Sequence, residues 1–202
     1  MSAITILDYA GVFVFSMSGL LAASEKKLDL FGGLIIAFVT ALGGGTLRDL
    51  FLNVDIGWII NTSYIYIVFC GTLGALLFKN TLKKIRKTAF LFDTIGISLF
   101  TILGVQKALE HNTHLVIAVL FGVITATFGG VIRDILCNEI PLIFRKEIYA
   151  TACLVGGISF VILHYWQINE TVNLIISGLL IAGIRTVAVI KKFSLPVLND
   201  KI

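Results

Sequence analysis

Two short motifs in the chain join glycines to an arginine and an aspartate at the same spacing. The first reads GGGTLRD over residues 43–49, and the second reads GGVIRD over residues 129–134. Glycine costs about 1 kcal/mol relative to alanine inside a helix, so consecutive glycines favour a kinked or unwound site. Carbonyl oxygens freed at such a site can contact a passing cation. The motifs therefore predict breaks in two pore helices, at Gly43, Gly44, Gly45, Gly129 and Gly130.

The charged residues of the motifs are expensive at membrane depth. An arginine at the centre of a spanning helix costs about 2.5–3.5 kcal/mol and needs a partner or a water path. Neighbours on a helix do not face each other, so we expect Arg48 and Arg133 to pair across the molecule rather than with Asp49 and Asp134. Two alternatives remain open. Each arginine could reach the headgroups from a helix end, and the glycines could serve only to let helices approach closely.

Further polar residues recur along the predicted helices. Asp8 and Asp93 open two of them, where an aspartate also interacts favourably with the helix dipole. The hydroxyl groups of Thr40 and Thr125, just before the glycines, could contact an ion or bond back to their own helix. The predicted polar or gating residues of a pore are thus Arg48, Asp49, Arg133, Asp134, Ser16, Thr40, Thr101, Thr125, Asp8 and Asp93.

Other chemistry is not indicated. No zinc-protease, nucleophile-elbow or phosphate-loop motif occurs, so the chain is not expected to be an enzyme or to hold a cofactor. His111 and His114 lack a third metal ligand nearby. The three cysteines lie in apolar runs and are expected to be buried free thiols. They are Cys70, Cys137 and Cys153.

Composition assigns these residues to a membrane protein. Of the 202 residues, 57% are hydrophobic and 14% are charged, and the mean hydropathy is +0.99. This excludes a water-soluble globule. The net charge of +4 comes from basic residues that form no stripe with exposed aromatics, which argues against nucleic-acid binding. The first apolar run has no basic segment before it and is expected to remain as a helix.

Seven apolar runs are long enough to be spanning helices. The third and sixth begin with polar residues, so six spans remain the alternative. The predicted fold class is an all-α membrane protein with seven transmembrane helices, at residues 4–23, 30–47, 58–78, 88–108, 115–136, 148–166 and 172–190.

Basic residues in the connections predict the orientation. With seven spans, Lys107 faces one side and twelve basic residues face the other, which should be cytoplasmic. The N-terminus should then lie outside and the C-terminus in the cytoplasm of a prokaryotic cell, with the protein in the plasma membrane. The twelve residues are Lys26, Lys27, Lys79, Lys83, Lys84, Arg86, Lys87, Arg145, Lys146, Lys191, Lys192 and Lys201.

The sequence repeats itself at an offset of 85 residues. Asp8 then matches Asp93, Tyr64 matches Tyr149, and the two glycine motifs coincide, which apolar bias cannot explain. A unit of three spans is odd, so the second copy must enter the bilayer from the opposite side. The sequence predicts an inverted repeat, with its transport site between the halves. The predicted units are a first repeat at residues 1–85, an inverted repeat at 86–170, and a seventh helix with a cytoplasmic tail at 171–202.

At these motifs the chain resembles the trimeric intracellular cation channel family, in its prokaryotic branch. The resemblance covers essentially the whole chain. It implies a homotrimer in membrane lipid, with an hourglass-shaped pore inside each protomer, narrowed by kinked second and fifth helices, that conducts potassium and other monovalent cations. Phe128 stands where the first motif has Gly43, so the two breaks need not be alike.

We therefore expect a passive monovalent-cation channel, potassium first. Its expected ligands are permeant potassium or sodium ions and bound lipid. Bacterial relatives are also catalogued as glycine transporters, so a secondary transporter for a small solute such as glycine is the alternative. A membrane scaffold without transport is the third reading.

Overall fold

The computed structural model describes residues 3–78 and 88–196, and this part of the chain is built from helices. Five of the helices are apolar and long enough to cross a bilayer. They are α1 (Ala3–Glu25), α2 (Leu30–Phe51), α6 (Thr88–Glu110), α7 (Leu115–Leu136) and α9 (Glu170–Lys191). Two further apolar helices are shorter, α4 (Ser63–Leu77) and α8 (Ala150–Tyr165).

The third predicted span is divided in the structure. A single helical turn, α3 (Gly57–Ile60), precedes α4, and the polar residues between them end the turn. The side chain of Asn61 accepts a hydrogen bond from the backbone N–H of Ser63 at 3.0 Å, which starts α4 afresh. The sixth predicted span is α8, preceded by the short 3-10 turn η1 (Leu142–Phe144).

Corresponding helices end in the same way. Lys27 after α1 and Asn112 after α6 both have positive φ, and so do Asn53 after α2 and Asn138 after α7. The left-handed conformation ends a helix sharply, and asparagine adopts it more readily than most residues. Both pairs are 85 positions apart, so the offset found in the sequence is also an offset between backbone conformations.

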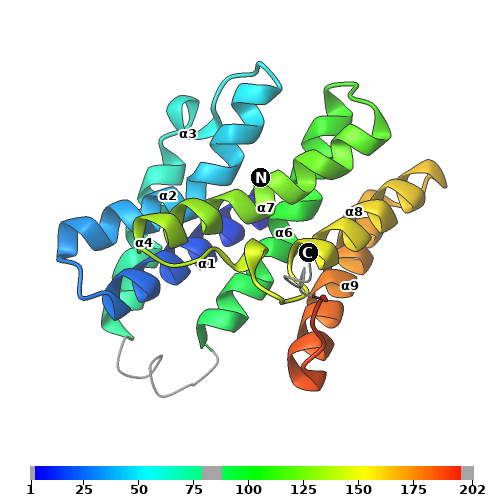
Figure 1. The fold of residues 1–202 in the computed structure, drawn as a ribbon. Coiled ribbons are helices and arrows are strands. Elements are labelled where there is room, and N and C mark those ends of the chain that lie inside the picture. Colours follow the sequence, from blue (N-terminus) through cyan, green and yellow to red (C-terminus); the bar gives the residue numbers. More distant parts are fainter. Residues whose placement is uncertain (1–2, 79–87, 197–202) are drawn as a thin grey trace, which may run out of the picture.

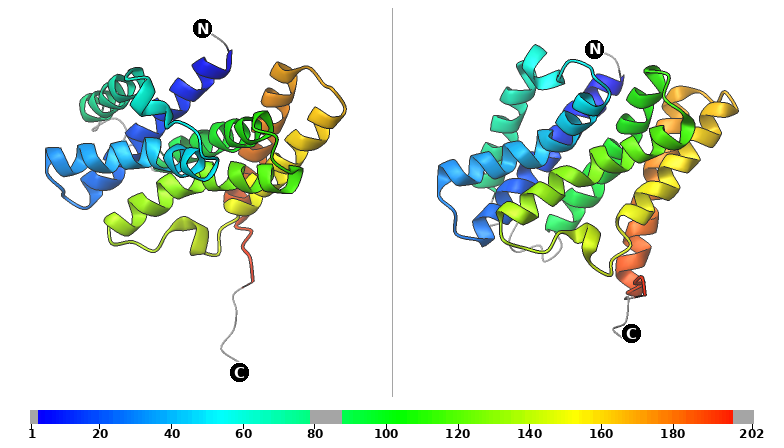
Figure 2. Two further views of the ribbon diagram at one scale, coloured as in Figure 1. Left: turned by 90° about the horizontal axis from the view of Figure 1, so that it is seen from above. Right: turned by 45° about the horizontal axis from the view of Figure 1, so that its top comes forward.

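Helices α2 and α7 pack against each other in the middle of the molecule. Helix α1 packs on α2 and α4, and α6 packs on α7 and α8 in the corresponding way (Figures 1 and 2). Helices α1 and α6 also touch each other, and α9 lies against α6 and α8. The two groups of helices thus share one central contact.

Much of the outer surface is apolar, as expected for a protein surrounded by lipid. Large hydrophobic side chains such as Phe31, Leu77 and Leu179 are about 70% exposed. Cys70 is also exposed, so the prediction that all three cysteines are buried is wrong for this one; Cys137 and Cys153 are buried and free. The hydrophobicity of its run reflected contact with lipid rather than with protein.

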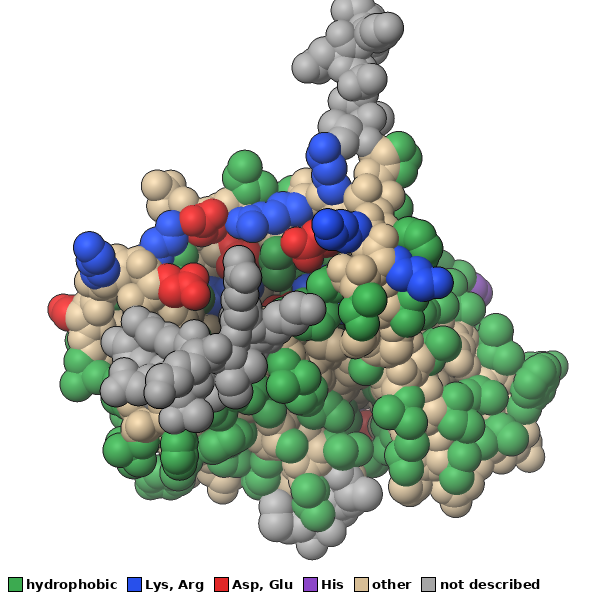
Figure 3. All heavy atoms as spheres, turned by 90° about the horizontal axis from the view of Figure 1, so that it is seen from below, with side chains coloured by type: hydrophobic (Ala, Val, Ile, Leu, Met, Phe, Trp, Pro, Cys, Tyr) green, Lys and Arg blue, Asp and Glu red, His purple; other side chains and the backbone are tan. Residues whose placement is uncertain are grey.

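Basic side chains gather at one end of the molecule (Figure 3). This end carries the connections after α1, before α8 and after α9. Its described basic residues are Lys26, Lys27, Arg145, Lys146, Lys191 and Lys192. Lys107 lies near the opposite end, in the last turn of α6. The remaining six residues of the predicted cytoplasmic group, Lys79, Lys83, Lys84, Arg86, Lys87 and Lys201, fall outside the described residues.

Candidate functional site

The glycine motifs lie where α2 and α7 cross. A Cβ atom on Gly44 would stand 2.1 Å from the carbonyl oxygen of Thr125, and one on Gly129 would stand 2.2 Å from that of Thr40. Neither position can hold a side chain without separating the helices, so the two backbones are in direct contact. The contact is reciprocal, because each glycine meets the threonine that precedes the other motif.

The predicted unwinding at the glycines is wrong. Helix α2 is continuous from Leu30 to Phe51, and α7 is continuous from Leu115 to Leu136. Each helix bends near its middle but stays helical (Figure 1). The close approach of the two backbones explains the small residues, so no freed carbonyl is needed to account for them.

The other motif glycines differ in their surroundings. Gly43 faces Ile132 of α7, whose Cδ1 would lie 3.3 Å from an added Cβ. Gly45 lines a pocket beside Arg48. A Cβ on Gly130 would lie 3.3 Å from the hydroxyl oxygen of Tyr149. Gly45 and Gly130 therefore leave room for polar side chains on either side of the crossing.

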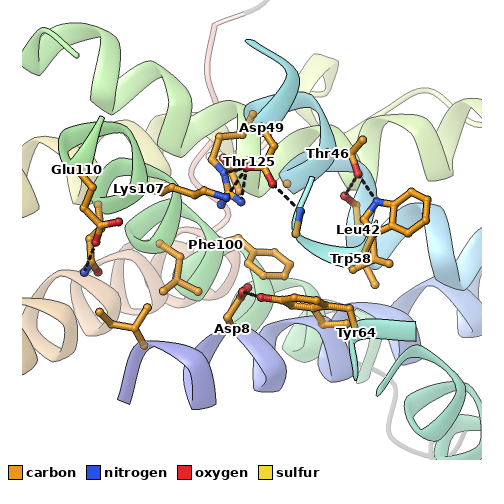
Figure 4. A pocket seen from close by; sticks show the side chains of 18 residues that line it. Asp8, Leu42, Thr46, Asp49, Trp58, Tyr64, Phe100, Lys107, Glu110 and Thr125 are labelled. Carbon is orange, nitrogen blue, oxygen red and sulfur yellow. Dashed lines mark hydrogen bonds and ion pairs between the residues drawn. The ribbon is translucent and has the colours of Figure 1, made fainter. Parts of the chain in front are cut away.

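The first pocket lies between the start of α1, the ends of α2 and α6, and α3. Its cavity volume is about 140 Å³. Asp49 is its most connected residue: one carboxylate oxygen accepts from Arg48 Nε and Lys107 Nζ, both at 2.8 Å, and the other accepts from the backbone N–H of Gly57 at 3.2 Å. Asp8 accepts a hydrogen bond from the hydroxyl group of Tyr64 (Figure 4).

The second pocket lies between the end of α1, the start of α6 and the ends of α7 and α9. Its cavity volume is about 380 Å³. Asp134 occupies the place that Asp49 has in the first pocket. One of its oxygens accepts from Arg133 Nε at 2.8 Å, and the other accepts from the backbone N–H of Leu142 at 3.2 Å. Both aspartates thus bind the arginine beside them and the N–H group eight residues further on.

Asp93 in the second pocket has more partners than Asp8 in the first. Arg185 Nη2 lies 3.1 Å from one of its oxygens, and Arg133 Nη1 lies 3.6 Å from the other. The hydroxyl group of Tyr149 donates to it at 3.4 Å, in the way that Tyr64 donates to Asp8. Arg133 Nη1 also donates to the hydroxyl oxygen of Ser18 at 3.1 Å, which ties α7 to α1.

The prediction that adjacent arginine and aspartate residues do not pair is wrong. Arg48 pairs with Asp49, and Arg133 with Asp134, at the distances given above. The spacing rule concerns the directions of Cβ atoms, whereas an arginine side chain is long enough to turn back to the next carboxylate. The second half of that prediction holds for Arg133, which also reaches Asp93 from another helix.

Of the four predicted hydroxyl residues, three line neither of these pockets. Ser16, Thr40 and Thr101 are buried, and each donates to a carbonyl group of its own helix. Thr125 does the same but also lines the first pocket. An added Cβ at Gly19 would meet Thr40 Oγ1 at 2.7 Å, and one at Gly104 would meet Thr125 Oγ1 at 2.6 Å. These threonines pack against the glycines of neighbouring helices.

A buried layer separates the two pockets. Along α1, Val12 lines the first pocket and Ser18 lines the second, six residues or about 9 Å of helix apart. Between them Phe15 is 1% exposed and packs edge-on against Phe100 of α6, with ring centroids 5.1 Å apart. These two phenylalanines are themselves 85 positions apart. In this conformation the layer is closed.

Several residues of the pockets were not predicted as site residues. Tyr64 and Tyr149 were visible as a matched polar pair in the repeat, and Lys107 as the single basic residue on its side of the membrane. Arg185 gave no such signal, because α9 has no counterpart in the repeat. Among the described residues no group of three or more His, Cys, Asp or Glu side chains could hold a metal ion. His114 instead caps α7.

The fold defines a class of protein: an all-helical integral membrane protein with charged pockets between its helices. Two stretches of equal length, residues 5–80 and 90–165, match the family model described as a glycine transporter. The two matches begin 85 residues apart and together cover more than half of the chain. The chain belongs to this family.

Bacterial relatives are known as membrane proteins. The chain is 40% identical over 159 residues to the UPF0126 membrane protein of Vibrio cholerae, a match that covers 78% of this chain and 66% of that protein. It therefore spans about two thirds of that relative. It is 38% identical over 161 residues to the UPF0126 inner membrane protein YadS of Escherichia coli, which covers 79% of this chain and 78% of that protein.

Solved structures confirm the resemblance to prokaryotic trimeric intracellular cation (TRIC) channels. The chain matches a TRIC cation channel with a TM-score of 0.89 and 34% identity, with full coverage of both chains. It matches the TRIC orthologue of Rhodobacter sphaeroides with a TM-score of 0.90 and 32% identity, over 96% of this chain and all of that one.

Proposed function

We propose that the protein is a passive monovalent-cation channel, with potassium as its main permeant ion and a pore inside each protomer. The observation that carries the proposal is the pair of charged pockets on opposite sides of the α2 and α7 crossing, built from matched Asp, Arg and Tyr residues. The likeness to TRIC cation channels supports it. The proposal is for transport and not for catalysis, and it needs no cofactor.

In this proposal the two pockets are the vestibules of the pore. Carboxylates beside each arginine keep cations acceptable where arginines alone would favour anions. The structure described here is the resting state, closed by Phe15 and Phe100. Opening would part these rings and join the two vestibules through a layer about 9 Å thick.

The proposed architecture is seven spanning helices, arranged as an inverted repeat with one additional helix. The repeat units are residues 1–85 and 86–170, and residues 171–202 add the seventh helix and tail. Recurring backbone conformations at 27 and 112 and at 53 and 138 support it, as do the two matches to one family model. Helices α4 and α8 would be the short third span of each unit.

The proposed assembly is a homotrimer in the prokaryotic plasma membrane, in contact with membrane lipids. The basic end would face the cytoplasm and the N-terminus would lie outside. The inner-membrane relative of E. coli and the trimeric channels among the solved structures support this arrangement.

Reconstitution in planar bilayers tests the proposal. With potassium chloride on one side and sodium chloride on the other, the reversal potential gives the selectivity. A single-channel current far above about 10³ ions per second exceeds ordinary catalytic turnover and identifies a channel. Absence of current in protein that is folded and trimeric would contradict the proposal.

The closed layer offers a sharper variant. Phe15→Ala should increase the open probability, because it removes half of the ring pair. Phe13→Ala on the same helix is the matched control, since Phe13 lies beside Gly74 of α4 and lines neither pocket. Equal currents in the two variants would remove the ring pair from the gate.

A secondary transporter for a small solute such as glycine is the second candidate. It is favoured by the description of the matching family model and by the first pocket, which presents both signs of charge in about 140 Å³. Uptake of labelled glycine into proteoliposomes, at a rate below 10³ per second and without ion current, would favour this candidate over the channel.

A further inference from the structure

A third cavity lies beside the first pocket, at the same end of the molecule. It has a volume of about 650 Å³ and lies between the ends of α6 and α8 and the start of α9. Gln106 and Glu110 of α6 line both this cavity and the first pocket. Glu170 of α9 lines the third cavity alone.

Two carboxylates in this cavity share one neutral partner. Glu110 and Glu170 both accept hydrogen bonds from the amide nitrogen of Gln106, at 3.2 and 2.5 Å. Within residues 3–78 and 88–196, no Lys or Arg side chain forms an ion pair with either carboxylate. The amine of Lys107 points away from Glu110 toward Asp49 (Figure 4). Two negative charges therefore converge without a counter-charge from the described side chains.

The amide between them is itself incompletely satisfied. Gln106 is only 6% exposed, and its carbonyl oxygen is buried without a hydrogen-bond partner. A buried acceptor left without a partner is costly, comparable to a lost hydrogen bond. The group that is missing beside Gln106, Glu110 and Glu170 must be one that oxygen atoms accept, and it must carry positive charge.

We infer that Glu110, Glu170 and Gln106 bind a calcium ion. Calcium binds carboxylate and amide oxygens in flexible geometry, and two carboxylates neutralise one divalent ion. The Gln106 amide supplies its oxygen as the third ligand by rotation about its last torsion, which is soft and roughly two-fold. With only three protein ligands and water in the remaining positions, the affinity falls in the weak range, about 10⁻⁴–10⁻³ M.

The ion would tie α6 to α9 at the rim of the first pocket. Glu110 lies one helical turn after Lys107, so an ion at Glu110 also fixes the part of α6 that holds Asp49. The site thus couples a divalent cation to the charge network of that pocket. This binding does not depend on whether the protein is a channel or a transporter.

Thermal unfolding of the full-length protein in detergent tests the inference. Calcium chloride at millimolar concentration, compared with potassium chloride at equal ionic strength, should raise the Tm by about 2–4 °C and saturate. Glu170→Gln should abolish the rise, and Glu110→Gln is a second variant that should do the same. Asp55→Asn is the matched control, because Asp55 is an exposed carboxylate near the same end that lines none of the three cavities.

Retention of the calcium effect in Asp55→Asn together with its loss in both glutamate variants would support the site. The same rise in potassium chloride, no rise in the wild type, or an unchanged rise in both glutamate variants would overturn it. Equilibrium binding of ⁴⁵Ca²⁺ gives an independent count, with one ion per chain expected in the wild type and none in Glu170→Gln.

Discussion

The two charged pockets are built from corresponding residues, yet they are held together differently. In the first, Asp8 contacts Tyr64, while Arg48 and Lys107 share Asp49. In the second, the residue that corresponds to Asp8 is Asp93, and it is held by two arginines as well as a tyrosine. The first pocket also has the smaller cavity, about 140 Å³ against about 380 Å³.

The extra arginine explains most of this difference. Arg185 comes from α9, which lies outside the repeat, and it is 1% exposed. Its guanidinium group also lies over the rings of Tyr149 and Phe90, at 4.4 and 5.2 Å from their centroids. The helix without a counterpart therefore fixes the charges of one half, whereas the other half relies on Lys107, whose side chain is 28% exposed. Duplicated halves can thus acquire different rigidity from a single added helix.

Removing Arg185 should have the largest effect. Arg185→Met leaves Asp93 buried with one arginine fewer, and breaking a buried ion pair in this way costs about 3–5 kcal/mol. Lys107→Met in the first pocket should cost about 1 kcal/mol or less, because Asp49 keeps Arg48 and the lysine is partly exposed. Thermal unfolding in detergent measures both, and equal losses would contradict the comparison.

Adding a methyl group at the helix crossing should cost about 3 kcal/mol, at or above the upper end of ordinary overpacking. Gly44→Ala and Gly129→Ala should lose the same amount, since each new Cβ meets a carbonyl oxygen at 2.1 or 2.2 Å. The control is Gly183→Ala in α9, where nothing lies within 4 Å of the added atom. Unequal losses at Gly44 and Gly129 would show that the crossing is not symmetric.

The tyrosine variants should separate the pockets more gently. Tyr64→Phe removes the hydrogen bond to Asp8 and should cost about 1.5 kcal/mol, the lower end for a bond to a charged group. Tyr149→Phe should cost less, because its bond to Asp93 is 3.4 Å long and Asp93 keeps two arginines. Unfolding by denaturant measures the difference, and a larger loss for Tyr149→Phe would reverse our interpretation.

The smallest effect should come from the rim of the second pocket. Glu139 accepts from Lys26 at 2.5 Å and pairs with Arg145 at 3.2 Å. The hydrogen bond and charge of Lys26, with a smaller contribution from Arg145, hold the pKa of this exposed carboxyl group below its ordinary value of about 4.5. The position 85 residues earlier is Val54, so the first pocket has no such pair.

A lowered pKa means that Glu139 stabilises the protein above its unfolded-state pKa and stops doing so as the pH falls through its folded-state pKa. The wild type should therefore have a slightly higher Tm than Glu139→Gln at pH 7, and the two should converge at pH 3. High salt should shrink the difference at pH 7. A difference that grows on acidification would exclude this ion pair as its cause.

The sequence was sufficient for the helices and for the residues that line the two pockets. Apolar runs located the long helices to within a few residues, and the repeat paired Asp8 with Asp93 and the two glycine motifs. It could not distinguish a broken helix from a close crossing at Gly44 and Gly129, because that depends on the backbone that faces them. The partner of Asp93 was also beyond reach, since Arg185 is 92 residues away and lies in the unrepeated helix.

The late position of Arg185 has a consequence for synthesis of the protein. When the ribosome has delivered helices α1 to α8, Asp93 and Arg133 already lie in the bilayer, but Arg185 has not yet been made. A nascent or truncated chain without α9 would expose this incomplete set of charges to membrane proteases. We expect the last helix to serve as a maturation checkpoint, so that only chains translated to their final span survive.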